Sequence, residues 1–163
     1  MVSRLRPSGI SSRLWDTGLR QLADIAVKAL SPSVNDPTTA TTCIGYLQAI
    51  LELLAAQVQP AAVRRYPDMN VTLVMRPPGF VTHLEALVQI GRYATTDARV
   101  VEVLLHATHR VAQAAMEAGA TEYAAEARLV TNRIARRALG SDTLDEEERA
   151  AVTAFVGRFP ARR

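Results

Sequence analysis

The polar residues best suited to take part in chemistry gather around two prolines, in the heptapeptide Ser31-Pro32-Ser33-Val34-Asn35-Asp36-Pro37. Proline disfavours helical geometry at the residue before it and is well tolerated at the first position of a helix. The spacing therefore predicts that one helix ends near Leu30 and that the next begins at Pro37. Asp36 is then the N-cap, and its carboxylate accepts a backbone N–H from the first turn.

The same corner carries the candidate ligand-binding residues, which offer hydroxyl, amide and carboxylate groups: Ser31, Asn35, Asp36, Thr38 and, shortly before the corner, Asp24. Two interpretations stay open. In the first, Asp36 only caps the helix and Asn35 makes a side-chain turn or takes a left-handed conformation. In the second, Asp36 and Asn35 hold a polar ligand or a cation, with Asp24 or His83 in support.

Asp24 lies within the first predicted helix, beside its apolar face. Arg20 at i−4 and Lys28 at i+4 are both placed to form a solvated ion pair with it. The alternative is a buried acid that faces the corner.

No catalytic residue, metal ligand or cofactor is assigned from the sequence. His106 and His109 stand three apart, but a metal ion would need a third ligand such as His83 or Asp97. The sequence contains no HExxH, P-loop, GxGxxG or GxSxG motif. The balance is therefore against an enzyme, although the question stays open.

The basic residues that stand closest together lie in one late helical segment: Arg128, Arg133, Arg136 and Arg137. They predict a solvated helix face, with contact to anionic lipid headgroups or to acidic residues of a partner as the alternative. The net charge of the chain is only +3 and no aromatic residues are interleaved with these arginines. A nucleic-acid partner is therefore not indicated.

Composition favours one globular domain. The 163 residues, 48% of them hydrophobic, suffice for one core. We expect a flexible N-terminal segment over 1–12 and a single helical domain over 13–159. The single cysteine, Cys43, excludes an internal disulfide and is expected as a small buried residue. No secretory signal is visible, and no apolar run reaches the roughly 20 residues that span a bilayer. By itself the chain is expected to be cytoplasmic.

Apolar residues recur at helical spacing in six segments, at roughly 13–30, 37–58, 82–94, 97–119, 121–140 and 143–159. The third is expected to be capped by Thr82, the fourth by Thr96 or Asp97, and the sixth by a capping box of Thr143 and Glu146. The fold class is therefore mainly α, a bundle of about six helices.

A short β-branched run, Val71-Thr72-Leu73-Val74, interrupts this pattern. It predicts either a strand or an extended connector, because a lone strand needs a partner. That partner is the 63–66 segment in a small hairpin, or the same strand of a second chain.

The run Asp24-Ile25-Ala26-Val27-Lys28-Ala29-Leu30-Ser31-Pro32-Ser33-Val34-Asn35-Asp36-Pro37, with the residues just before and after it, resembles the signature of a bacterial family, the predicted membrane proteins of domain of unknown function 2254. The resemblance extends more loosely through Phe80, 87–90 and 100–105, and so covers roughly 15–115. It implies the part of a membrane protein that follows its transmembrane helices. A longer chain of this kind would be membrane-associated.

These observations favour a helical module without catalytic activity that acts by association, with self-association into a homo-oligomer as the expected partnership. The alternative is a small-ligand-binding domain or enzyme with its polar site at the Ser31–Pro37 corner.

Overall fold

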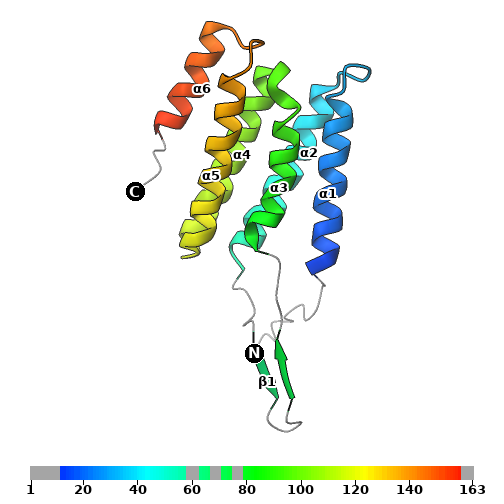
Figure 1. Ribbon diagram of the computed structural model, residues 1–163, viewed down its shortest axis with the longest axis vertical. Coiled ribbons are helices and arrows are strands. Elements are labelled where there is room, and N and C mark those ends of the chain that lie inside the picture. Colours follow the sequence, from blue (N-terminus) through cyan, green and yellow to red (C-terminus); the bar gives the residue numbers. More distant parts are fainter. Residues whose placement is uncertain (1–11, 58–62, 67–70, 75–78, 159–163) are drawn as a thin grey trace, which may run out of the picture.

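Six α-helices alternate in direction along the long axis of the molecule (Figure 1): α1 (Ser12–Ala29), α2 (Pro37–Ala55), α3 (Phe80–Gly91), α4 (Ala98–Glu117), α5 (Thr121–Leu139) and α6 (Glu146–Arg158). A single 3₁₀ turn, η2 (Ala94–Thr96), joins α3 to α4. The computed structural model describes residues 12–57, 63–66, 71–74 and 79–158. Within these ranges the predicted fold class, a mainly α bundle, is confirmed.

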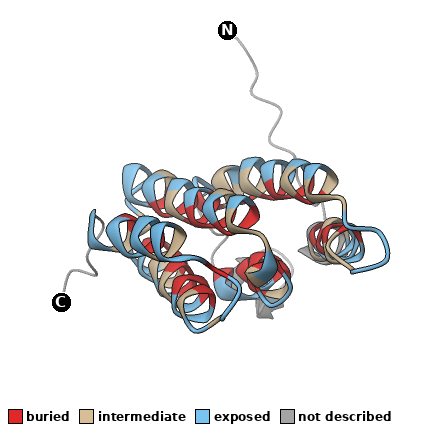
Figure 2. Cartoon of the chain, turned by 90° about the horizontal axis from the view of Figure 1, so that it is seen from above, coloured by how far each residue is buried: buried red, intermediate tan, exposed pale blue. Residues whose placement is uncertain are grey.

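The first five helices form a ring around a shared core. α1 packs on α2 and α3, α2 packs also on α4, and α5 closes the ring by packing on α4 and α3. α6 lies outside this ring, mainly against α5 (Figure 1). Figure 2 shows the buried residues turned toward the middle of the bundle. Fully buried leucines such as Leu47, Leu87 and Leu104 supply much of this core, and such burial is the main favourable term in folding.

The corner between α1 and α2 is built as the prolines predict. α1 ends at Ala29, and Pro37 is the first residue of α2 with Asp36 as its N-cap. The backbone N–H of Asp36 donates to the carbonyl of Ala29 at 2.8 Å. This hydrogen bond holds the start of α2 next to the end of α1. α2 ends at Ala55, three residues before the predicted end.

Two predicted helix starts are wrong. Thr82 lies inside α3, whose N-cap is Gly79 and carries no side-chain cap. α6 begins after Asp145, whose carboxylate accepts from the backbone N–H of Glu148 at 2.8 Å while Glu148 returns the bond at 2.9 Å. Thr143 instead donates its hydroxyl to the carbonyl of Thr95, in η2. The capping box is therefore Asp145 with Glu148.

α3 also ends earlier than predicted, at Gly91, where it approaches α5 closely. A Cβ added to Gly91 would lie 3.1 Å from Cγ1 of Ile134, so a larger residue would require the Ile134 side chain to move by a few tenths of an ångström. The prediction placed this end near Ala94, which belongs to the 3₁₀ turn.

Two four-residue strands form an antiparallel pair below the helices in Figure 1: β1 (Val63–Tyr66) and β2 (Val71–Val74). Val63 pairs with Val74 and Tyr66 with Val71. Of the predicted alternatives for the β-branched run, the structure has the hairpin partner within the chain. The connecting residues 67–70 lie outside the described residues, as do residues 1–11 of the predicted N-terminal segment 1–12, whose last residue, Ser12, begins α1.

Candidate functional site

The Asp36 carboxylate is committed to the start of α2. Its Oδ1 accepts the backbone N–H of Thr39 at 3.0 Å, and its Oδ2 accepts the hydroxyl of the same threonine at 2.5 Å. These hydrogen bonds, the hydroxyl first, hold the pKa of Asp36 below its usual value. Because both oxygens face Thr39, the carboxylate acts as the helix cap.

The other predicted corner residues serve the same turn. Asn35 has a φ of 44°, the left-handed conformation that short amide side chains tolerate. The Ser31 hydroxyl donates to the carbonyl of Lys28 at 2.7 Å. The Thr38 carbonyl accepts from Thr41 and Thr42 at 3.0 and 2.9 Å. These contacts are those of the first, purely structural interpretation, and none of the four corner residues lines a cavity described here.

Asp24 is brought to a different place, a pocket between α1 and α3. The pocket has a volume of about 480 Å³ and is lined by residues of both helices and by Arg92 and Tyr93 just after α3. Its size is within the range of small-molecule sites. The sequence did not indicate this pocket, because its two walls are more than fifty residues apart in the chain.

Asp24 does not form the predicted ion pair but has a different partner. Its Oδ1 accepts from Nε2 of Gln89, on α3, at 2.9 Å, and no ion pair links it to Arg20 or Lys28 among the residues the structure describes. Asp24 is exposed, so the alternative of a buried acid facing the corner is also wrong. A contact across 65 residues has no local signal in the sequence.

His83 forms the second bridge across this pocket. Its side chain is only 6% exposed, and Nδ1 lies 2.9 Å from Oδ1 of Asp16 on α1. The ring N–H is not aligned with that oxygen, since Nδ1 has no hydrogen-bond partner of acceptable geometry among the described residues. This close approach places the imidazole edge against α1 while the ring lines the pocket.

The remaining histidines lie elsewhere, between α4 and α6. The ring of Phe155 stands edge-on to His106, with centroids 4.8 Å apart, and to His109, with centroids 6.1 Å apart. Burial, followed by the neighbouring His106, lowers the pKa of His109. No group of three or more histidine, cysteine or acidic side chains within metal-binding reach occurs among the described residues.

Cys43 and the late arginines take ordinary structural positions. Cys43 is a free, buried thiol whose pKa is raised by burial. Arg133 lies 3.7 Å from Glu85 of α3, and the Nε of Arg136 donates to the carbonyl of Asn132 at 3.4 Å.

The outer face of α2 is a feature that the sequence interpretation missed. Tyr46 and Leu53, two helical turns apart, are 59% and 65% exposed; Ala49, which lies between them, and Gly45, which precedes Tyr46, are small and exposed. Glu52 is the one charged residue of α2. We call the strip formed by Gly45, Tyr46, Ala49 and Leu53 the α2 outer face.

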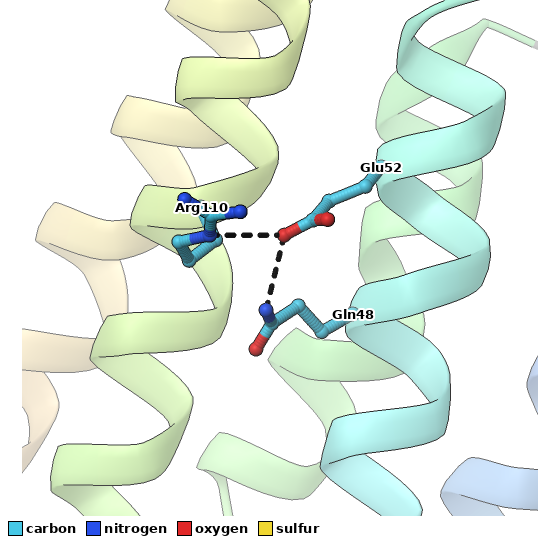
Figure 3. Close-up of polar contacts among 3 residues, drawn as sticks. All are labelled: Gln48, Glu52 and Arg110. Carbon is cyan, nitrogen blue, oxygen red and sulfur yellow. Dashed lines mark hydrogen bonds and ion pairs between the residues drawn. The ribbon is translucent and has the colours of Figure 1, made fainter.

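Glu52 does not point out of this face. Its Oε1 accepts from Nε of Arg110, on α4, at 3.3 Å and from Nε2 of Gln48 at 3.0 Å (Figure 3). The charge of α2 is thus turned sideways toward α4, and the α2 outer face carries none.

Comparison with known proteins defines the class. The model of the predicted membrane protein family DUF2254 matches residues 15–110, and this chain belongs to that family. The match begins within α1 and ends within α4, so it contains the corner, the α2 outer face and the α1–α3 pocket.

Individual relatives are uncharacterized mycobacterial proteins. The chain is 33% identical over 142 residues to Rv1290c of Mycobacterium tuberculosis and, with the same identity, to Mb1321c of Mycobacterium bovis. The aligned part is 86% of this chain but 26% of each relative, so the chain spans about a quarter of their length. No solved structure matches the chain. None of the described helices combines the length and apolar character required to cross a bilayer.

Proposed function

We propose that this region of the DUF2254 family is a helical association module without catalytic activity, and that it pairs with a second copy of itself through the α2 outer face. The observation that supports this most strongly is the pairing of Glu52 with Arg110, which leaves two turns of exposed helix uncharged. Large apolar side chains exposed in a row commonly mark a contact surface.

The composition of the face suits a copy of itself. A two-fold interface places the same patch on both partners, so a charged patch would meet its own charge, whereas an uncharged one meets no repulsion. Large and small residues also alternate along the strip. A Cβ added to Gly45 would have no neighbour within 4 Å, so the surface is open there to a side chain from a second α2.

Further exposed apolar side chains belong to the same helical pair. Ile25 of α1 is 50% exposed and Val34 of the corner is 49% exposed. Four of the eight exposed large hydrophobic side chains among the described residues thus fall between 25 and 53. This concentration favours the α1–α2 side of the bundle over the α5–α6 side as the place of association.

The experiment compares two leucines of equal exposure. Leu53 on α2 and Leu129 on α5 are both 65% exposed, so replacing either by glutamate changes the surface equally. We expect Leu53→Glu to weaken self-association by roughly tenfold or more, because the apolar contact is lost and a charge must be desolvated. Leu129→Glu should leave it unchanged. Molar mass by sedimentation equilibrium over a wide concentration range measures both.

Two results would contradict the proposal. One is a wild-type chain that stays monomeric at every concentration, which would leave the α2 outer face to another occupant, such as another part of a longer chain. The other is an equal loss of association in Leu53→Glu and Leu129→Glu, which would remove the assignment to α2.

A further inference from the structure

The α1–α3 pocket contains charged groups that differ in whether they have partners. Each of its carboxylates has one: Asp16 lies against His83 Nδ1, Asp24 accepts from Gln89, and Glu85 lies 3.7 Å from Nη1 of Arg133. The pocket's acids are therefore already engaged by the protein.

The two arginines of the α1–α3 pocket, in contrast, have no partner among the described residues. Arg20 and Arg92 line the same pocket, and neither side chain forms an ion pair or hydrogen bond with any other described residue. Gln89 is level with Asp24, so Arg20 lies about 6 Å along the helix axis to one side of this bridge and Arg92 about 4.5 Å to the other. Arg20 and Arg92 thus flank the Asp24–Gln89 bridge, and each side chain is long enough to extend toward its level from its own side. A pair of guanidinium groups without partners suits a carboxylate, which accepts from their N–H groups.

The charge balance sets how much negative charge the site can take. The lining carries Asp16, Asp24 and Glu85 against Arg20 and Arg92, and Arg133, outside the lining, makes the numbers of acids and arginines equal. A monoanion would therefore bring the site to a net charge of −1 and a dianion to −2, so the site favours the smaller charge.

The floor of the pocket is apolar. Leu19 and Ala86, which are 3% and 7% exposed, line it, and so does Tyr93, which is 53% exposed and follows Arg92 in the chain. The bridges Asp16–His83 and Asp24–Gln89 limit the space along the helices. A ligand there has room for an apolar body below an acidic group.

We propose that the α1–α3 pocket binds a small organic monocarboxylate, with its carboxylate held by Arg20 and Arg92 and its apolar part over Leu19 and Ala86. The site is separate from the helix corner and from the α2 outer face. The proposed carboxylate site therefore does not depend on whether the chain self-associates.

The test uses three probes of equal chain length on the complete chain: hexanoate, hexanol and hexylammonium. In amide NMR titrations, hexanoate should shift signals of residues 16–24 and 82–93, while the neutral and cationic probes should bind more weakly. Arg20→Gln and Arg92→Gln should each weaken hexanoate binding about tenfold, since each removes a hydrogen bond to a charged group. The matched control is Arg99→Gln, on the exposed side of α4 and outside the pocket, which should not change it.

The amide spectrum also reports whether each variant stays folded. Tighter binding of hexylammonium than of hexanoate would overturn the assigned ligand class. The absence of shifts at both pocket walls with hexanoate, or an equal loss of binding in Arg99→Gln, would overturn the site. Leu53→Glu should bind hexanoate as the wild type does. A failure of the association proposal can therefore be told apart from a failure of the proposed carboxylate site.

Discussion

α2 and α5 have the same length, 19 residues, and both pack against α4, yet they meet the solvent in different ways. α5 surrounds its exposed Leu129 with arginines and glutamates, whereas α2 presents Tyr46 and Leu53 on a face from which its one charge, Glu52, is turned toward α4. Their buried faces are alike, since both consist mainly of alanine and aliphatic residues, with Cys43 in α2 and Thr131 in α5 as the exceptions. The core therefore does not require the difference. The difference between α2 and α5 lies in their outer faces, and it affects what each helix can contact.

The largest effects should come from the buried faces and should be similar for the two helices. Leu47→Ala in α2 and Ile134→Ala in α5 each leave a cavity under a residue that is at most 3% exposed. We expect each to lower the free energy of unfolding by about 3 kcal/mol, measured by urea denaturation. A loss in one helix alone would mean that the two do not share one cooperative core.

An intermediate effect should appear at the start of α2, which has a side-chain cap that α5 lacks. Asp36→Ala should lower the thermal midpoint by less than Leu47→Ala does, because one cap is lost but no cavity forms. The pKa of Asp36 is lowered in the folded chain, so its contribution is present above the usual aspartate pKa and is lost as pH falls through the lowered value. Asp36→Asn should remove this acid dependence. An unchanged acid profile in Asp36→Asn would show that the carboxylate does not stabilise α2.

The smallest effect concerns the acids that each helix turns away from the solvent. Burial raises the pKa of Glu126 on α5, a hydrogen bond from Val81 opposes this in part, and its Oε2 has no partner among the described residues. Its ionised form therefore costs stability, so stability is lost as pH rises through the raised pKa. Glu126→Gln should raise the thermal midpoint slightly at neutral pH and leave it unchanged in acid. Glu52→Gln, which loses the pair with Arg110, should lower it slightly. Shifts of the thermal midpoint with the same sign in both variants would contradict the difference between Glu126 on α5 and Glu52 on α2.

The features that the sequence predicted are those with local causes. Pro37, Asp36 and Asp97 act within one helical turn, and each starts a helix where its residue type predicts. The capping box of α6 shows the limit of this reasoning, since Thr143 with Glu146 and Asp145 with Glu148 both match the pattern. The contact of Thr143 with Thr95, from another part of the chain, separates them.

The candidate site required information that one sequence does not hold. Asp24 has two cations at the right spacing on its own helix, and local reasoning therefore chose Arg20 or Lys28 over the distant Gln89. The corner residues allowed both a capping and a ligand-binding interpretation because caps and turns use the same polar side chains as binding sites do. The α2 outer face escaped notice because only packing shows which apolar residues of an apolar helix remain exposed.

The mass of the unaltered chain in solution tests most directly whether the α2 outer face joins two copies. One chain has a mass of 17.7 kDa. Sedimentation equilibrium should give a mass that rises with concentration toward twice this value, and Leu53→Glu should hold it at the single-chain mass. A wild-type mass that equals one chain at all concentrations would contradict self-association through α2.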